Sequence, residues 1–510
     1  MPRRISASPS TPESQPLLQD STNLNEANVE TPNNRFSYFR FVLLLVLFFA
    51  IVWSLILLLD MFVSVGLDSH LGSGFENLYF SLISIASLTL SILFYRVPSH
   101  MDEVFGKVTA GLLVLDMVVI LAVEHLRRQL GPFTLCLTFG GAIVSVLLGA
   151  YSNEVIYWNK QTARDQAVAE STLRRGERNT FGGFRQFLLS FIDSSARAIL
   201  LLVVLVASIG LYIDGFDGQL TPLGDLVTVG SELNGRFYAP RVHISCTPAG
   251  KDGPIVIAEA GETSAEEFSN WILAAEKIKA VCYWDRPGHG FSENVPSPAN
   301  MATITSFLNA ALEQELPDFR NESIVLVAHG VGGLYARVFA SQHPEQITGI
   351  MLVDALHEEQ FYRKQSWYSG LGHFIKGVWD ASGVNKVIGV FFGQDSQDRI
   401  YGLFEGQETR LQRSLLQEQI SASRRTKVDI DLATSNLPRD TPLLVVSAKD
   451  HKDKQWFQYQ RRLLKLTDDV LAWKLLEGPH EIWRNRRSAR ELTKLLTNFV
   501  RYGTDPPQFV

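Results

Sequence analysis

Cysteine is scarce in this chain, because only three of its 510 residues are cysteine. Three cysteines exclude a small domain built on a disulfide framework, and they exclude a cysteine-rich metal site. Basic residues are not in excess either: 47 Lys and Arg face 53 Asp and Glu, a net charge of -6. A nucleic-acid-binding domain usually carries a basic surface, so we expect no nucleic-acid partner. We also expect no cofactor and no metal ion.

Aromatic residues are almost missing from the first 34 residues, which are rich in Ser, Thr, Pro, Asn and Glu. Such a segment buries too little apolar surface to fold, so residues 1–38 are predicted to form a disordered cytosolic tail. No signal-peptide cleavage pattern precedes the first apolar run. Within the tail, Glu13-Ser14-Gln15-Pro16-Leu17-Leu18 is similar to the acidic dileucine signal of membrane proteins sorted to endosomes, lysosomes or vacuoles. A chance match is the alternative.

Apolar residues cluster before about residue 213. Phe41–Leu59 is an uninterrupted apolar run that is long enough to cross a bilayer. Four weaker runs follow it: Leu78–Tyr95, Val108–Val123, Phe133–Tyr151 and Ile199–Tyr212, the last extended backwards by the amphipathic stretch Phe187–Ile192. We therefore predict a transmembrane region of about five helices over residues 39–213, with the core helices of a soluble protein as the alternative. Asp116 lies inside the third run, where it is either functional or hydrogen-bonded to a neighbouring helix.

The distribution of Lys and Arg predicts the orientation. The tail carries Arg3, Arg4, Arg35 and Arg40, whereas the loop after the first run has acidic residues only. The loops after the second and fourth runs are basic, with Arg96, Lys107, Lys160, Arg164, Arg174, Arg175, Arg178 and Arg185, while Arg127 and Arg128 fall on the opposite side. The N-terminus is thus predicted in the cytosol. With five spans, the rest of the chain is luminal or extracellular, where the sequon at Asn321 can be glycosylated. An endosomal or vacuolar membrane fits, and a mitochondrial one stays open.

Strand-like and helix-like segments alternate from about Pro222 to Val510, which is typical of a mostly parallel sheet with helices on both faces. Eight strands are expected. They cover residues 226–229, 241–246, 255–258, 280–283, 324–327, 349–353, 442–447 and 470–474. The insertion at residues 355–440 is rich in large aromatic side chains and is expected to form a helical lid.

A β-branched run, a glycine-rich corner and a helical pattern follow one another around Ala328-His329-Gly330-Val331-Gly332. The corner resembles the Gly-x-Ser-x-Gly elbow of the α/β-hydrolase superfamily, in the branch of esterases, epoxide hydrolases and proline iminopeptidases. Gly330 stands where that pattern has its nucleophilic serine. Glycine has no side chain that could attack a carbonyl carbon.

Other motifs extend the resemblance over residues 222–510. Glu259-Ala260-Gly261 looks like the loop that supplies an oxyanion-hole amide, and the stretch from Trp284 to Ser292 is close to the family's Asp-Arg-x-Gly-x-Gly-x-Ser corner. Asp450 follows the penultimate strand, where the family has its acid. His480 follows the last strand, where the family has its base. The resemblance thus implies a remnant pair of Asp450 and His480 beside the degenerate position Gly330.

The remaining site residues follow from the same resemblance. Gly261, Glu262, His329, Val331 and Gly332 belong to the oxyanion loop and the elbow. Glu262 points either at the oxyanion position, where a carboxylate would repel developing negative charge, or to solvent. His329 is expected to pack beside the elbow. Asp354, after the sixth strand, is an alternative partner for His480.

Three functions are compatible with these features. The missing serine favours a membrane-anchored binding or regulatory protein without serine-hydrolase catalysis. An active hydrolase of an ester, epoxide or lipid is the alternative, using His480 with a water molecule or another nucleophile. A membrane sensor or transport accessory is the third. Expected partners are the lipid bilayer together with a lipid-like or small apolar ligand, or a protein.

Overall fold

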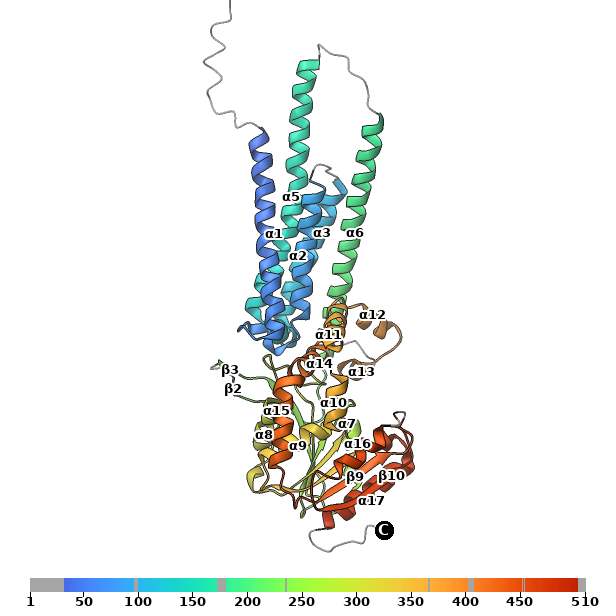
Figure 1. Cartoon of the computed structure of the whole chain (residues 1–510). Helices are drawn as coiled ribbons and strands as arrows, with labels where there is room; N and C mark the ends of the chain where they lie inside the picture. Colours follow the sequence, from blue (N-terminus) through green and yellow to red (C-terminus); the bar gives the residue numbers. More distant parts are fainter. Residues whose placement is uncertain are drawn as a thin grey trace, which may run out of the picture.

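The computed structural model describes residues 32–95, 100–171, 180–233, 236–365, 367–401, 408–451, 453 and 455–502. It has a bundle of long helices standing on a domain in which helices cover a sheet (Figure 1). Most of the predicted tail, the dileucine motif and the basic residues Arg3, Arg4, Arg96, Arg174, Arg175 and Arg178 lie outside the described residues. Helix α1 begins at Pro32, inside the segment predicted as disordered, because the helix extends beyond the apolar run.

The bundle consists of α1 (Pro32–Phe62), α2 (Phe75–Leu93), α3 (His100–Ala122), the short α4 (Glu124–Leu130), α5 (Pro132–Ser171) and α6 (Thr180–Asp217). Five stretches are long and apolar enough to cross a membrane, by length and composition: Tyr38–Phe62, Phe75–Leu93, Met101–Ala122, Pro132–Ser152 and Phe187–Asp217. The five predicted apolar helices are therefore confirmed. Only 17% of the first span's apolar window is buried inside the protein, so most of its side chains face outward, where lipid would lie.

Asp116 is fully buried and is hydrogen-bonded to α6. The hydroxyl groups of Ser208 and Tyr212 donate to its carboxylate at 2.7 and 2.6 Å. Of the two alternatives for Asp116, the structure has the hydrogen-bonded one. These hydrogen bonds explain how a carboxyl group is accommodated inside the bundle, so no ion pathway is needed to explain it.

The chain after α6 forms an eight-stranded sheet, as predicted. Its order is β1-β4-β6-β5-β7-β8-β9-β10, in which β1–β4 and β4–β6 are antiparallel and all other neighbours are parallel. The strands are β1 (Asp225–Thr228), β4 (Arg241–Pro248), β5 (Ile255–Glu259), β6 (Ala280–Trp284), β7 (Ile324–His329), β8 (Ile347–Val353), β9 (Leu443–Ala448) and β10 (Val470–Leu476). A separate hairpin, β2 (Ser231–Leu233) and β3 (Arg236–Tyr238), lies between β1 and β4 in the sequence.

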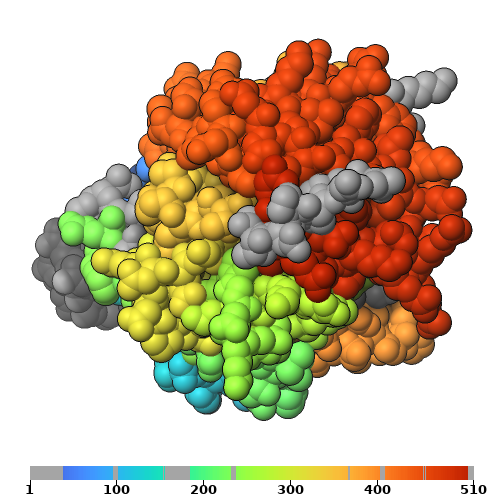
Figure 2. All heavy atoms as spheres, turned by 90° about the horizontal axis from the view of Figure 1, so that it is seen from below, coloured from blue at the N-terminus to red at the C-terminus, as the bar shows by residue number. Residues whose placement is uncertain are grey.

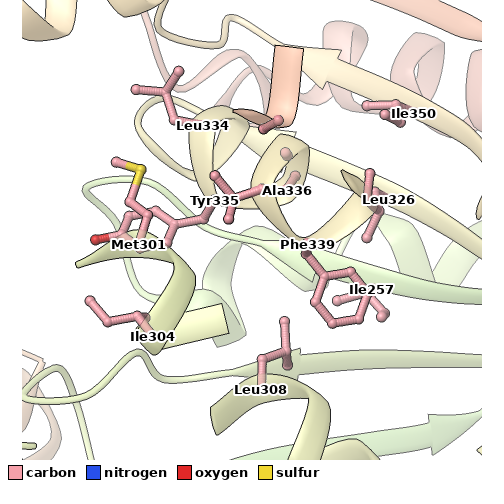
Figure 3. Close-up of a cluster of buried hydrophobic side chains, with 14 of the residues drawn as sticks. Ile257, Met301, Ile304, Leu308, Leu326, Leu334, Tyr335, Ala336, Phe339 and Ile350 are labelled. Carbon is pink, nitrogen blue, oxygen red and sulfur yellow. The ribbon is translucent and has the colours of Figure 1, made fainter. Parts of the chain in front are cut away.

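Helices cover both faces of the sheet because consecutive strand residues point to opposite sides. Ile257 and Leu326 pack on one face, under α8 (Met301–Glu315), α9 (Gly332–Gln342), α15 (Lys427–Asn436) and α16 (Trp456–Leu463). Figure 3 shows Ile304 and Leu308 of α8 and Phe339 of α9 in this core. Val256 and Val325 pack on the other face, against α7 (Ala265–Ser269) and α17 (Arg486–Arg501). Seen from the end opposite the bundle, most of the coloured surface belongs to the second half of the chain (Figure 2).

A helical lid lies between β8 and β9. It consists of α10 (Glu358–Lys364), α11 (Trp367–Asp380), α12 (Val384–Phe391), α13 (Ser396–Ile400), α14 (Thr409–Ser421), a π-helical turn (Ala422–Thr426) and α15. In Figure 1, α11 and α12 lie at the lower ends of the bundle helices. This part of the lid therefore lies next to the bundle, whereas α15 packs on the sheet.

Buried polar contacts join the bundle to the lid. Arg399 of α13 makes two hydrogen bonds to the carboxylate of Asp217 at the end of α6, at 2.8 and 2.6 Å. Arg413 and Gln417 of α14 donate to the backbone oxygens of Gly72 and Met61. A buried charge or amide is stable only when it has such partners, so these contacts fix the lid relative to the spans.

A further ion pair joins the bundle to the sheet domain. Arg128 of α4 contacts Glu293 with two hydrogen bonds, at 2.7 and 2.8 Å. Arg128 was one of two basic residues that the orientation argument placed on the unexpected side. Its charge is compensated by a carboxylate of the same chain.

Candidate functional site

The corner between β7 and α9 is built by backbone that only glycine can form easily. Gly330 has φ of +54°, in the left-handed region. Its carbonyl oxygen accepts hydrogen bonds from the amides of Gly333 and Leu356, at 3.2 and 2.8 Å. At Gly332 an added Cβ would lie 2.3 Å from the carbonyl oxygen of Glu259, and at Gly261 one would lie 2.6 Å from that of His329. The elbow and the loop after β5 therefore touch backbone to backbone.

Glu262 fills the space in front of Gly330. A Cβ added to Gly330 would lie 2.0 Å from Oε2 of Glu262, closer than real atoms approach. The same oxygen lies 3.5 Å from Nε2 of His480. Of the two directions left open for Glu262, the structure has the one toward the site. The carboxylate lies where the side chain of a nucleophile at position 330 would project.

His480 is paired with Asp354, and the predicted pairing with Asp450 is wrong. Nδ1 of His480 lies 2.6 Å from Oδ2 of Asp354. The carboxylate of Asp450 is exposed and accepts instead from the amide of Gly478, at 3.1 Å. Asp354 follows β8 and Asp450 follows β9, which are parallel neighbours, so both acids reach the same edge of the sheet.

The two acids differ in burial, and this difference explains why Asp354 is the partner of His480. Asp354 is fully buried, and its Oδ1 accepts from the amide of Ala448 at 2.8 Å and from the indole of Trp456 at 2.7 Å. These two donors orient the carboxylate so that Oδ2 faces the imidazole. From the sequence, Asp354 was only an alternative partner for His480, and Trp456 was not predicted to belong to the site. A buried indole N–H needs a hydrogen-bond acceptor, so Trp456 was a possible signal for a buried carboxylate nearby.

The His480 imidazole lies between two carboxylates. Burial alone would lower its pKa, but the hydrogen bonds and charges of Asp354 and Glu262 outweigh burial and raise the pKa to about 9. Partial desolvation opposes ionisation of Glu262, whose side chain is half-exposed in the cavity, but the hydrogen bond and charge of His480 and the charge of Arg286 outweigh it and lower the pKa to about 2. At neutral pH the site therefore contains an imidazolium ion and an ionised Glu262. A protonated imidazole cannot take a proton from a nucleophile.

His329 is buried beneath this ion pair. Neither ring nitrogen has a hydrogen-bond partner among the described residues, and burial lowers its pKa to about 3. Its ring packs on those of His480 and Trp483, with centroids 4.2 and 4.5 Å apart. The neutral ring of His329 thus forms the floor below His480.

Two sets of side chains bring potential metal ligands within 4.8 Å of one another: Glu262, His329 and His480, and Asp354, His451 and His480. Both sets depend on His480. Since its two ring nitrogens already face carboxylates, the ion pairs account for this closeness, and the geometry gives no separate reason for a metal.

A cavity of about 370 Å³ opens in front of the site, and Glu262 and Val331 form part of its wall. Other parts of the wall come from the corner after β6 and from helices α10, α11 and α14. Arg286 supports the oxyanion loop by donating to the carbonyl oxygen of Gly261 at 2.6 Å, and it pairs with Glu418 of α14 at 3.4 Å. The cavity thus has a charged floor and a mixed polar and apolar wall under the lid, which suits a small ligand with one polar end.

Comparisons with known families also divide the chain into two parts, but their boundary lies at β4, inside the sheet domain. Residues 2–246 match a family described as a region of unknown function (DUF2417), and residues 253–371 match the family described as the α/β hydrolase fold. An uncharacterized protein of Schizosaccharomyces pombe is 27% identical over 492 residues, 90% of each chain. An uncharacterized vacuolar membrane protein of Saccharomyces cerevisiae is 24% identical over 295 residues, 49% of this chain and 45% of the relative.

Solved structures similar to the chain include hydrolytic enzymes. An enol-lactonase of Burkholderia xenovorans has 16% identity and a TM-score of 0.38, covering 53% of this chain and 98% of its own. A haloalkane dehalogenase of Agrobacterium tumefaciens has 15% identity and a TM-score of 0.39, covering 53% and 96%. With the family match and the sheet order, the chain is one that carries an α/β-hydrolase domain after a helical region with five candidate membrane spans.

Proposed function

We propose that the α/β-hydrolase domain binds a small apolar or lipid-like ligand in the cavity under the lid, in a binding or regulatory role, without serine-hydrolase catalysis. The observation that carries this proposal is the position of Glu262. Its carboxylate fills the space in front of Gly330, 3.5 Å from His480. In a working triad this space holds the nucleophilic oxygen, and the histidine is neutral so that it can accept the proton.

Three features of the site oppose acyl transfer together. Gly330 supplies no attacking atom, so no covalent intermediate can form there. The raised pKa of His480 leaves no free base at neutral pH. An ionised Glu262 beside the oxyanion loop disfavours the negative charge that develops on a tetrahedral intermediate. Binding, in contrast, requires only the cavity.

We further propose that the domain lies on the non-cytosolic side of an endosomal or vacuolar membrane. Cys246 and Cys282, opposite each other on β4 and β6, form a disulfide, and disulfides persist mainly in oxidising compartments. Asn321 is exposed, as a glycosylation site must be. The vacuolar membrane relative supports the same assignment.

Hydrolysis assays on the full-length protein in lipid nanodiscs test the absence of catalysis. We expect no turnover of short-chain and long-chain 4-nitrophenyl esters above that of a His480→Ala variant. Turnover that is lost in the variant would contradict the proposal. A positive control with an active esterase in the same nanodiscs shows that the substrates reach the site.

An active hydrolase is the second candidate, and one observation favours it. Glu262 faces the cavity, with 52% of its side chain exposed, so its carboxylate is placed to hold a water molecule there. In that case Glu262→Gln would abolish turnover as completely as His480→Ala. This result would replace the binding function by a carboxylate-assisted hydrolysis.

A further inference from the structure

A second cavity, of about 590 Å³, lies between the lid and the first membrane span. Leu58 and Phe62, at the end of α1, form one wall. The other wall is formed by α11 and α14, with Gly370, Leu371, Phe374, Leu416 and Ile420. These side chains are apolar, so the cavity offers a surface for hydrocarbon. We call it the α1–lid groove.

The α1–lid groove adjoins the cavity in front of the site. Gln365 and Gln419 line both cavities, one from the end of α10 and the other from α14. Along α14, Leu415 lines the site cavity and the next residue, Leu416, lines the groove. The two amide side chains therefore separate the groove from the cavity in front of the charged site.

The lid contacts the C-terminal part of the fifth candidate span. At Gly210, within the span Phe187–Asp217, an added Cβ would lie 2.5 Å from Cα of Gly383, so α6 and the start of α12 touch backbone to backbone. Gly210 precedes the end of the span by seven residues, or about 10 Å of helix at about 1.5 Å per residue. The start of α12 consequently lies beside the last two turns of this candidate span.

The outer face of α11 and α12 has the composition of a helix at a membrane interface. Large apolar side chains are exposed there: Tyr368, Leu371, Ile375, Trp379, Ile388, Val390, Phe391 and Phe392. Trp and Tyr prefer the boundary between hydrocarbon and water, and amphipathic helices with such faces lie in it. A lipid surface therefore fits this face, and Leu371 belongs both to the face and to the lining of the groove.

We propose that the α1–lid groove takes up an acyl chain of a membrane lipid from the adjoining leaflet and directs the polar end of that lipid, past Gln365 and Gln419, toward Glu262 and His480. This inference rests on the proposed binding function and names its ligand class. The lipid reaches the site sideways, from the membrane and between a span and the lid.

Photo-crosslinking in vesicles tests the inference on the full-length protein. The probe is phosphatidylcholine with a diazirine at the end of one acyl chain, and crosslinked peptides are identified by mass spectrometry. Gly370→Phe fills the groove, because the new side chain starts 3.6 Å from Cβ of Gln419. Gly372→Phe, on the same helix but with no atom within 4 Å of its Cβ, is the matched control.

We expect crosslinks to α11, α14 and the end of α1. Gly370→Phe should reduce them about tenfold, because the phenyl ring excludes about two methylene groups of the acyl chain from the groove. Gly372→Phe should leave them unchanged. Ile420→Trp, on α14, gives a second blocked variant if Gly370→Phe does not fold. A probe with the diazirine near the glycerol ester should label the loop after β5.

Equal crosslinking of the wild type, Gly370→Phe and Ile420→Trp would overturn the inference, because the probe would then report lipid around the spans only. Absence of label in the loop after β5 would overturn the connection to the site. Either failure is distinct from failure of the proposed function, which is decided by ester turnover. A thermal unfolding temperature equal to that of the wild type shows that a variant with a blocked groove is folded.

Discussion

Asp354 accepts three hydrogen bonds in a fully buried position, from Ala448, Trp456 and His480. In Asp354→Asn the side chain keeps its shape, and asparagine tolerates the backbone φ of +46° at this position. Its amide N–H group, however, then faces the N–H group of the His480 ring. We expect a loss of about 2–3 kcal/mol in the free energy of unfolding, the cost of a lost bond to a charged group. Thermal unfolding of the detergent-purified protein measures it.

Asp450→Asn is the matched control, since Asp450 is exposed and its change should stay within about 0.5 kcal/mol. Equal losses in the two variants would show that the acids share the role that we assign to Asp354.

The two carboxylates around His480 also predict a pH dependence. The pKa of His480 is raised from 6.5 to about 9, so its stabilising contribution is complete below pH 6.5 and is lost as the pH rises through 9. The pKa of Glu262 is lowered from 4.5 to about 2, so its contribution is complete above pH 4.5 and is lost toward pH 2. The pair stabilises the fold most between pH 4.5 and 6.5.

Unfolding of the wild type and of Glu262→Gln from pH 6 to pH 9.5 measures this contribution. We expect the wild type to be more stable by about 1–2 kcal/mol at pH 6, after allowance for solvent screening of the half-exposed Glu262, and the difference to vanish near pH 9.5. A constant difference would mean that Glu262 stabilises the protein in another way.

The sequence predicted the residues of the site better than their pairing. Glycine at position 330 and histidine at position 480 could be placed because each follows a strand at a fixed edge of the sheet. The choice between Asp354 and Asp450 depends on donors from Ala448 and Trp456, which are more than 90 residues from Asp354 in the sequence. The direction of Glu262 depends on the approach of His480, which a local pattern does not contain.

At the scale of elements, the contact between α6 and the lid depends on buried charge. Asp217 and Arg399 are almost completely buried, so removal of one partner leaves the other charge without compensation. For Arg399→Ala we expect a loss of about 3–5 kcal/mol, detected as a lower unfolding temperature and faster proteolysis of α12 and α13.

Arg320→Ala is the matched control. Arg320 pairs with Glu313 at 3.0 Å on the surface, and such pairs contribute at most about 1 kcal/mol. If both variants lose the same stability, the pair with Asp217 does not hold the lid.

Periodicity predicted the elements well and their contacts poorly. All eight strands of the main sheet and all five candidate spans were expected, because strand runs of β-branched residues and span-length apolar runs are strong local signals. The short hairpin of β2 and β3 was not expected. The sequence did not show that α14 donates to backbone oxygens at Gly72 and Met61. These contacts join segments more than 300 residues apart, and arginine and glutamine in a helix are ordinary surface residues in any local pattern.

For the whole molecule, the orientation of the protein in the membrane remains a prediction. In a eukaryotic secretory host Asn321 should be glycosylated, since it is exposed and lies on the side of the membrane reached after five spans. Endoglycosidase treatment should increase the mobility of the wild type and leave Asn321→Gln unchanged. A protease-accessible C-terminal tag on intact cytosol-facing vesicles would instead put the domain in the cytosol.

The most direct test of the account asks what occupies the nucleophile position. It compares fluorophosphonate labelling of the wild type, Gly330→Ser and the double variant Gly330→Ser, Glu262→Ala in nanodiscs at pH 7.5. Serine at φ of +54° costs about 1–3 kcal/mol of strain, which a large domain tolerates. Without Glu262, His480 loses one of its two carboxylates and can act as a base.

We predict no label on the wild type, little on Gly330→Ser because the carboxylate of Glu262 obstructs the serine, and clear label on the double variant that disappears with His480→Ala. Label on the wild type would contradict the account by revealing another nucleophile. Equal label on the single and the double variant would contradict it by showing that Glu262 does not block the position.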